Sequence, residues 1–308
     1  MPTVETNAEA SSGPPPKQGD AGLFAQIKEW AEMIKIEHTV FALPFALSGL
    51  LLGADKVPPP LVWLWTILAF AGARAAAMTL NRLIDAGLDA LNPRTKTRAI
   101  PAGKISTSKA LLFSIIAFGI MIGAATQLPP ICLMLSPIAV FWLSLYSFTK
   151  RFTWLCHLVL GIALGGAALG GWIAAGGQLN QLPPWLLAIS VSCWVAGFDI
   201  IYALQDVDFD REHRLHSIPS KFGIANALVI SSVLHIVTVA MLIILGVKMN
   251  LGPAFWLGAS AVGIMLKYEH SLVKPDDLSK VNAAFFNING AVSILTFVAI
   301  FIDRAFLR

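Results

Sequence analysis

Long apolar runs recur along the chain from residue 37 onward and leave little choice of fold. A membrane-spanning helix needs about 20 consecutive, mostly apolar residues, and nine runs of roughly that length can be marked out. They cover residues 37–54, 60–81, 109–127, 130–148, 153–175, 183–205, 224–246, 251–268 and 285–303. Because 56% of the residues are hydrophobic and 13% are charged, the chain is predicted to be an all-α, polytopic membrane bundle of nine transmembrane helices.

The N-terminal segment differs in composition from the rest. Residues 1–22 are polar and Pro-rich and cannot bury a core, so they are predicted to form a disordered cytoplasmic tail before a membrane domain at 23–308. They lack the features of a signal peptide, and the absence of arginine argues against a mitochondrial transit peptide. Residues 23–36 have helical apolar spacing with interleaved charges, which predicts an interfacial helix. We therefore expect a protein of the bacterial cytoplasmic (inner) membrane.

The distribution of basic residues predicts the orientation. Cytoplasmic loops of membrane proteins are enriched in Lys and Arg. With nine spans and a cytoplasmic N-terminus, 17 of the 22 Lys and Arg residues fall on the cytoplasmic side and four on the opposite side. Arg74 lies within the second span. The polar loops after the second, fourth and sixth spans are therefore predicted to be cytoplasmic.

A first polar group follows the second span, in the stretch NRLIDAGLDALNPRTKTRAIPAGK at 81–104. Asn81, Asp85 and Asp89 are spaced four residues apart, so they share one face of a helix. Carboxylates beside an amide make an oxygen-rich site suited to Mg²⁺, which favours a few carboxylates plus phosphate oxygens. The basic residues that follow could hold an anion against this metal. They are Arg94, Lys96, Arg98 and Lys104.

A second polar group ends the sixth span, within residues 198–223. Asp199, Asp206 and Asp210 have the spacing of one helical stripe, and Asp199 lies deeper in the apolar run. An acid inside an apolar span is a functional candidate by default. Asp208 falls off the stripe and is predicted to be solvated. Nearby cations are again present, at Arg211, Arg214 and Lys221.

A third group lies in LYSFTKRF at 145–152, at the end of the fourth span. Tyr146 and Lys150 are four residues apart, so a phenol and an ammonium group can reach one ligand. Two acid groups at one membrane face suggest two Mg²⁺ ions that bridge a diphosphate, and a diphosphate held by a membrane protein suggests a lipid tail. Metal and basic groups would stabilise the diphosphate as a leaving group.

These motifs resemble the UbiA superfamily of intramembrane aromatic prenyltransferases, and the resemblance runs from about residue 25 to the C-terminus. It rests on N-x-x-x-D-x-x-x-D at 81–89, N-P-R-T-x-x-R-x-I-P-A-G at 92–103, Y-x-x-x-K at 146–150 and D-x-x-x-D at 206–210. The resemblance implies a nine-helix bundle that transfers a prenyl chain from a polyprenyl diphosphate with Mg²⁺ as cofactor. Many members have Asn-Asp at the start of the first motif, where this chain has Asn81-Arg82.

The resemblance also implies residue roles. Asn81, Asp85 and Asp89 would hold one Mg²⁺, and Asp206 and Asp210 would hold the other. Arg94, Arg98, Tyr146 and Lys150 would contact the diphosphate, with Lys96 beside them. The role of Asp199 is predicted from its position and not from the resemblance. It lies seven residues before Asp206, about 10 Å deeper at about 1.5 Å per residue, so it would orient the acceptor or take its ring proton. The alternative is a structural acid bonded to Arg74 or another polar neighbour.

Within the superfamily, residues 34–49 and 198–206 are most similar to 4-hydroxybenzoate polyprenyltransferases, which make 3-polyprenyl-4-hydroxybenzoate for ubiquinone. They are equally similar to enzymes that prenylate aminodeoxyfutalosinate for menaquinone. The expected partners are a polyprenyl diphosphate, an aromatic acceptor and membrane lipid, with no nucleic acid and with the oligomeric state left open. A secondary transporter is the alternative from another class, since transporters also carry intramembrane acids.

Overall fold

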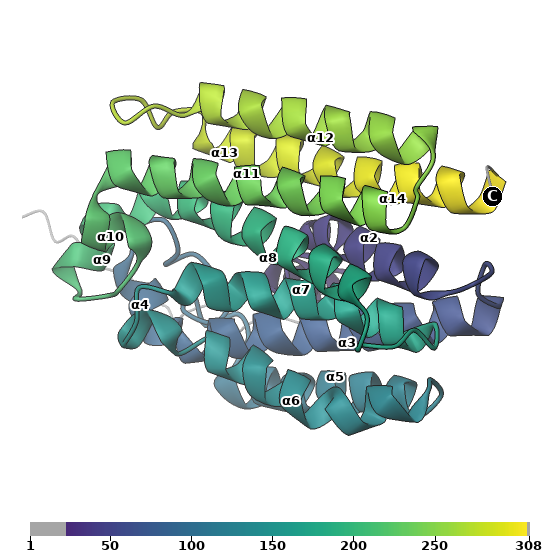
Figure 1. Ribbon diagram of the computed structural model, residues 1–308. Coiled ribbons are helices and arrows are strands. Elements are labelled where there is room, and N and C mark those ends of the chain that lie inside the picture. Colours follow the sequence, from purple (N-terminus) through teal and green to yellow (C-terminus); the bar gives the residue numbers. More distant parts are fainter. Residues whose placement is uncertain (1–22, 307–308) are drawn as a thin grey trace, which may run out of the picture.

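The chain forms a bundle of long helices that run roughly side by side, with short helices and loops gathered at one end (Figure 1). The computed structural model describes residues 23–306, so the predicted tail at 1–22 lies outside the described residues. The long helices are α2 (Ile36–Gly53), α3 (Pro60–Ile84), α5 (Thr107–Ala125), α6 (Pro130–Tyr146), α7 (Cys156–Ala174), α8 (Leu182–Ala203), α11 (Ile224–Lys248), α12 (Pro253–Leu272) and α14 (Asn289–Phe306).

Each predicted apolar run coincides with one of these helices, and the all-helical prediction is confirmed. Within residues 23–306, six helical stretches are long and apolar enough to cross a membrane. They include α3, α5, α7, α11, α8 with its extension to Glu212, and α14 with the segment from Val281. The apolar stretches Ala42–Gly53, the described part of α2, and Pro130–Tyr146, which is α6, are shorter than a full span. The helix α12 is not among the six. Nine spans therefore remain a prediction.

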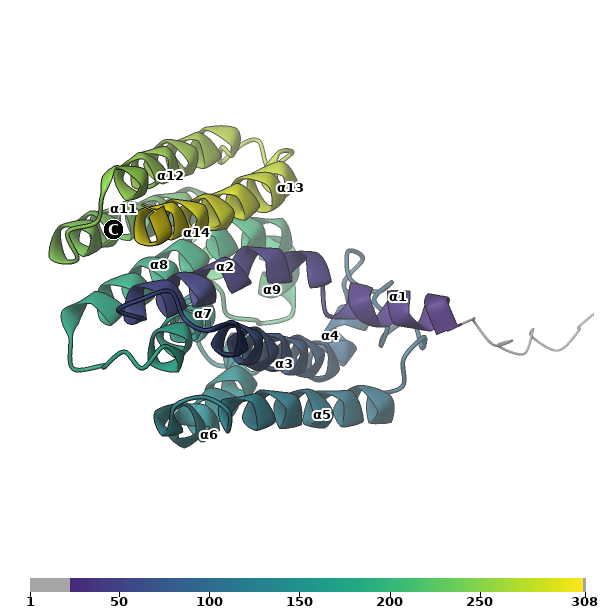
Figure 2. The ribbon, with the colours of Figure 1, turned by 90° about the vertical axis from the view of Figure 1, so that its right-hand side faces the viewer.

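The N-terminal helix α1 (Leu23–Met33) packs beside the bundle at its polar end (Figure 2). Lys35 has a positive φ of 51°, which breaks the chain direction between α1 and α2. Trp30 packs on Phe113 with ring centroids 4.6 Å apart, and Lys104 forms an ion pair with Glu29 at 2.7 Å. The helix thereby covers the loop that follows the first acid group.

The helix α8 forms the centre of the core. Trp194 is fully buried, packs between Phe45 of α2 and Phe198, and donates from its indole to Asn289 Oδ1 at 2.9 Å. A buried indole N–H needs such a partner, because an unpaired polar group in an apolar core is costly. This packing joins α8 to both α2 and α14.

Glycines allow α2 and α7 to pack closely. A Cβ atom on Gly171 would lie 1.8 Å from the Ala46 carbonyl oxygen, and one on Gly49 would lie 2.0 Å from that of Ala168. Small residues at such contacts let helix backbones approach each other in membranes. The first and second halves of the chain are thereby held in a fixed register.

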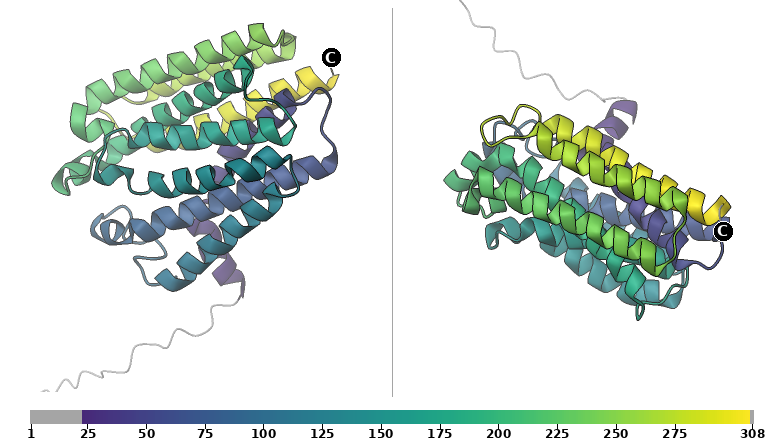
Figure 3. Two further views of the ribbon diagram at one scale, coloured as in Figure 1. Left: turned by 60° about the horizontal axis from the view of Figure 1, so that its bottom comes forward. Right: turned by 45° about the horizontal axis from the view of Figure 1, so that its top comes forward.

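The short elements lie together at one end of the bundle (Figures 1 and 3). They are α4 (Ala86–Leu91), η1 (Thr149–Arg151), η2 (Leu204–Asp206), α9 (Val207–Glu212) and α10 (Ile218–Phe222). All three predicted polar motifs fall in these elements or in the adjoining helix ends. The topology therefore brings together residues that are far apart in the sequence.

Candidate active site

The first acid group, which comprises Asp85 and Asp89 with Asn81 beside them, lies where α3 ends and α4 begins. The helix α3 ends at Ile84, and Asp85 has φ −88° and ψ 1°, so the predicted continuous helix through Asp89 is interrupted. The backbone bonds from Asp85 N to Asn81 O (2.9 Å) and from Asp89 N to Asp85 O (2.8 Å) persist across the break. The spacing on one side of the chain is kept even though the regular helix is not.

The backbone of the second acid group, Asp199, Asp206 and Asp210, differs more strongly from the predicted single helix. The helix α8 ends at Ala203, a 3₁₀ turn covers Leu204–Asp206, and α9 begins at Val207. A 3₁₀ turn has about 3.0 residues per turn in place of 3.6, so it rotates the residues beyond it out of the α-helical register. The prediction that Asp199, Asp206 and Asp210 form one helical stripe is therefore wrong. Each of the three acids has a different partner.

Two acids of the site pair with basic groups across α3, α4 and the loops. Arg98 Nη1 lies 2.6 Å from Asp89 Oδ1, and both residues belong to the stretch at 81–104. Arg151 Nη2 lies 3.0 Å from Asp85 Oδ1. Arg151 was not singled out from the sequence, although it directly follows Lys150 of the Y-x-x-x-K motif.

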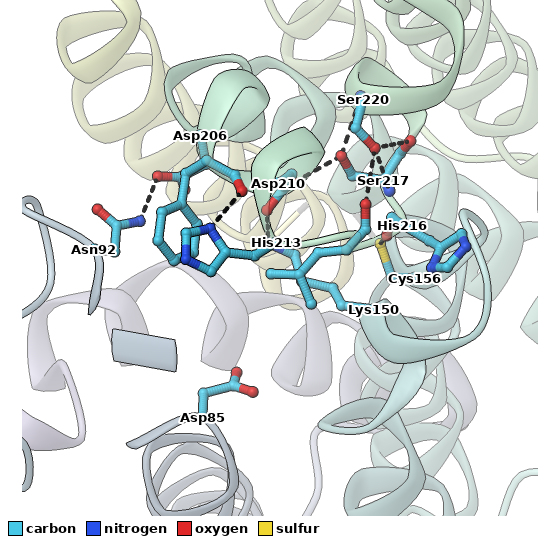
Figure 4. A network of polar contacts seen from close by, with 12 residues as sticks. Asp85, Asn92, Lys150, Cys156, Asp206, Asp210, His213, His216, Ser217 and Ser220 are labelled. Atoms are coloured by element: carbon cyan, nitrogen blue, oxygen red, sulfur yellow. Dashed lines mark hydrogen bonds and ion pairs between the residues drawn. The ribbon is translucent and has the colours of Figure 1, made fainter. Parts of the chain in front are cut away.

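The other two acids, Asp206 and Asp210, pair with the predicted diphosphate ligands Arg94 and Lys150. Figure 4 shows Asp206 beside Asn92, and Asp210 near Lys150 and Ser217. Arg94 binds Asp206 through both Nε (3.0 Å to Oδ1) and Nη2, and Asn92 Nδ2 donates to Asp206 Oδ1 at 3.2 Å. Lys150 Nζ lies 3.7 Å from Asp210 Oδ1, and Ser217 Oγ donates to Asp210 Oδ2 at 2.8 Å. The structure thus places a basic residue against every one of the four aspartates predicted to bind metal.

The pKa of Lys150 reflects this setting. Burial lowers the pKa of its ammonium group, but the Asp210 carboxylate and other nearby negative charges outweigh burial and raise it overall. Lys150 is therefore a cation at the site. Lys96, in contrast, is exposed, and within residues 23–306 no polar contact of its side chain joins it to this cluster.

A small polar pocket lies beneath these pairs and meets a large apolar cavity. Its walls are Asn81, Asp85, Tyr146, Ser147, Lys150, Cys156 and Asp199. The cavity has a volume of about 500 Å³ and lies between α3, α6 and α7, with further walls from α2 and α5. Tyr146 lines both spaces, and Arg74 lines the cavity. A charged group and a lipid-like group could thus be bound next to each other.

Two side chains missed by the sequence analysis support this pocket. His157 Nδ1 lies 2.7 Å from Asp199 Oδ2, so the polar neighbour that Asp199 binds is His157 and not Arg74. Tyr202 Oη accepts a hydrogen bond from Arg94 Nη1 at 3.0 Å. Nothing in the spacing of these residues signals the contacts, because they join separate helices and loops.

The acid groups fit Mg²⁺ in chemical type. Asp89 Oδ2 is buried and has no hydrogen-bond partner within residues 23–306, so it is left with an open acceptor site of the kind that a hard cation prefers. Asn81 uses its amide nitrogen to donate to Asp85 Oδ2 at 3.0 Å, which leaves its oxygen for a ligand. In the described part of the chain, no three His, Cys, Asp or Glu side chains converge as a metal site. The remaining ligands would be amide, water or phosphate oxygens, as is usual for Mg²⁺.

The bundle, its acid and basic pairs and the apolar cavity below them define an integral membrane protein built to hold a charged group beside a lipid-like one. A model of the UbiA prenyltransferase family matches residues 42–291. The chain belongs to the UbiA prenyltransferase family, and the prediction from the four motifs is confirmed. It is a UbiA-type aromatic prenyltransferase.

Individual relatives agree with this assignment. The 4-hydroxybenzoate octaprenyltransferase of Vibrio atlanticus (strain LGP32) is 30% identical over 266 residues, 86% of this chain and 92% of that one. The enzyme of the same name from Aliivibrio salmonicida (strain LFI1238) is 32% identical over 257 residues, 82% of this chain and 88% of that one.

Solved structures share the fold. The apo structure of a UbiA homolog from Aeropyrum pernix K1 is 35% identical, with a TM-score of 0.80 over 87% of this chain and 98% of that one. A UbiA homolog from Archaeoglobus fulgidus bound to GPP and Mg²⁺ is 18% identical, with a TM-score of 0.70 over 88% of this chain and 99% of that one.

Proposed function

We propose that the protein transfers the chain of a polyprenyl diphosphate to carbon 3 of 4-hydroxybenzoate, a step of ubiquinone biosynthesis, with Mg²⁺ as cofactor. The name of the bacterial relatives, 4-hydroxybenzoate octaprenyltransferase, supports this acceptor. Membership of a prenyltransferase family disfavours the transporter alternative. We further propose that the acid-bearing end faces the cytoplasm, as the distribution of Lys and Arg predicts.

The environment of Arg74 supports 4-hydroxybenzoate as the acceptor. Arg74 faces the apolar cavity, and its buried Nε has no hydrogen-bond partner in the described part of the chain. It lies seven residues before Asn81 on the same helix, hence on the same face and about 10 Å deeper at about 1.5 Å per residue. A guanidinium in apolar surroundings needs an anion, and its fork suits a carboxylate. The carboxylate of 4-hydroxybenzoate would meet this need.

The remaining residues would bind Mg²⁺, the diphosphate and the polyprenyl chain. Mg²⁺, held at Asn81, Asp85 and Asp89 and at Asp206 and Asp210, would supply positive charge to the departing diphosphate. Arg94, Arg98, Lys150 and the Tyr146 hydroxyl would hold the diphosphate oxygens. The apolar cavity would take the polyprenyl chain and keep water from the reacting carbon.

The reaction then follows from these positions. The bond from carbon 1 of the chain to the diphosphate oxygen breaks, and its electron pair leaves with the diphosphate. An electron pair of the acceptor ring forms the new carbon–carbon bond. Asp199, in the wall of the polar pocket, would accept the proton from the same ring carbon, and the electrons of that carbon–hydrogen bond restore aromaticity.

The test is a direct assay with purified protein, Mg²⁺ and a polyprenyl diphosphate, and with products identified by mass spectrometry. The acceptors are 4-hydroxybenzoate, its uncharged methyl ester and aminodeoxyfutalosinate. The expected product is 3-polyprenyl-4-hydroxybenzoate. Product from aminodeoxyfutalosinate alone would overturn the acceptor, and no product from any acceptor would overturn the prenyl transfer.

A variant tests the role of Arg74. Loss of a hydrogen bond to a charged group costs about 1.5–3 kcal/mol, so Arg74→Gln should raise KM for 4-hydroxybenzoate by about tenfold or more. KM for the polyprenyl diphosphate should change little. The methyl ester is the matched control, because its KM should be similar in both proteins. An equal effect on the acid and the ester would show that Arg74 does not bind the carboxylate.

A further inference from the structure

We propose that His157 is a positioning residue that fixes the Asp199 carboxylate for the proton-transfer step, an inference that rests on the proposed function. His157 lies in the first turn of α7, and Asp199 lies one turn before the end of α8. The two side chains meet at 2.7 Å between Nδ1 and Oδ2. They are 42 residues apart in the sequence, so this contact depends on the packing of α7 against α8.

His157 is more deeply buried than Asp199, as expected if His157 positions the Asp199 carboxylate. The His157 side chain is 1% exposed, whereas the Asp199 side chain is 24% exposed. His157 is therefore sealed in the protein, and Asp199 also borders the polar pocket beside Tyr146 and Lys150. One carboxylate oxygen is held from behind while the carboxylate remains open toward the pocket.

The hydrogen bonds of His157 indicate the tautomer and charge state of its imidazole ring. Its Nε2 is buried with no partner within residues 23–306. An unpaired N–H buried in this way would be costly, so the ring is best accommodated as the neutral tautomer with its proton on Nδ1. In that form the imidazole donates to Asp199 Oδ2, and Asp199 keeps its negative charge and its capacity to accept a proton.

A fixed carboxylate matters because its terminal torsion is soft. The χ2 angle of aspartate has a broad distribution, and Lys150 borders the same pocket and could attract a freed carboxylate. Without His157, Asp199 could therefore turn away from the acceptor ring. Proton removal from the prenylated ring would then slow, while the groups that hold the diphosphate would be unchanged.

The experiment compares His157→Leu, which removes the donor, with His157→Asn, whose amide nitrogen can stand where Nδ1 stood. His157→Leu should lower kcat by about tenfold to a hundredfold, the loss expected for a hydrogen bond to a charged group, with the Kd for the Mg²⁺–polyprenyl diphosphate complex unchanged. His157→Asn should recover most of kcat. A matched control is His235→Asn, which changes another buried histidine, on α11, whose partners are the Trp194 carbonyl, His270 and Glu269. It should leave kcat near the wild-type value.

The outcomes separate the alternatives. Full kcat in His157→Leu would overturn the proposal, and so would equal losses of kcat, diphosphate binding and thermal stability in both His157 variants. In an Asp199→Asn background, His157→Leu should cause no further loss of kcat, and additive losses would also overturn it. If His157→Leu does not fold, His157→Gln takes its place, since its amide is displaced by one bond. If the wild-type protein transfers no prenyl group, the proposed function itself fails.

Discussion

Arg151 ties the end of α3 to the connection between α6 and α7 through its ion pair with Asp85, with Nη2 and Oδ1 3.0 Å apart. The same guanidinium donates to the carbonyls of Ser147 (2.9 Å) and Ile84 (2.9 Å). Three contacts from one planar group hold Asp85 at a fixed place between two parts of the chain. The positive charge also compensates in part for the burial of the carboxylate.

This pair predicts the pH dependence of metal use. Burial raises the pKa of Asp85 above its ordinary value, and Arg151 opposes this rise. Metal binds the deprotonated carboxylate, so protons compete more strongly as the pH falls. The Mg²⁺ concentration for half-maximal activity should increase on acidification, beginning above the usual aspartate pKa of about 3.9.

Arg151→Gln should shift this profile to higher pH, because it removes the group that lowers the pKa of Asp85. Arg211→Gln is the control, since Arg211 donates to the Ser220 carbonyl. The measurement is activity against Mg²⁺ concentration at a series of pH values. An identical profile for the wild type and Arg151→Gln would contradict the proposed coupling.

Substitution of the neighbouring aspartates Asp206 and Asp208 should have very different effects on turnover. Asp206 is 8% exposed and bound by Arg94 and Asn92, whereas Asp208 is exposed. Asp206→Asn should lower turnover by about a hundredfold, the scale for loss of a key electrostatic group. Asp208→Asn should leave turnover near the wild-type value. The assay is run at limiting Mg²⁺, and similar turnover in the two variants would remove Asp206 from the metal site.

Two adjacent glycines should respond differently to alanine. A Cβ atom on Gly171 would clash with the Ala46 carbonyl, whereas one on Gly170 meets no atom within 4 Å. Gly171→Ala should lower the free energy of unfolding by about 1–3 kcal/mol, as overpacking does. Gly170→Ala should not destabilise the protein, because alanine favours the helix. Thermal unfolding in detergent checks both, and equal melting temperatures would rule out tight packing between α2 and α7.

The orientation in the membrane can be tested by cysteine labelling. Single cysteines in the loops at 90–108, 150–153 and 211–222 should react with an impermeant reagent from the cytoplasmic side. Cysteines at Gly177, in the connection between α7 and α8, and at Lys248, the last residue of α11, should react only from the opposite side. Reaction of the three motif loops from different sides would be incompatible with a shared site.

Local sequence was sufficient for the helical architecture and, through the four motifs, for the family. The long apolar runs identified each long helix, because hydrocarbon requires backbone hydrogen bonds to be satisfied within the segment. The aspartates at 85, 89, 206 and 210 were identified from spacing and from the cost of charge near apolar runs. By length and hydropathy six helical stretches within residues 23–306 qualify as spans, whereas α6, α12 and the described part of α2, Ala42–Gly53, do not.

The tertiary structure alone decided which groups pair. Arg94 with Asp206 and His157 with Asp199 are separated by 112 and 42 residues, and no periodicity within a helix relates such partners. The 3₁₀ turn at Leu204–Asp206 also redirected the second acid group, so that Asp199 faces His157 while Asp206 faces Arg94. Sequence spacing fixes positions only along one regular helix. Contacts between helices depend on how closely their backbones pack, as at Gly49 and Gly171, and on where each helix ends.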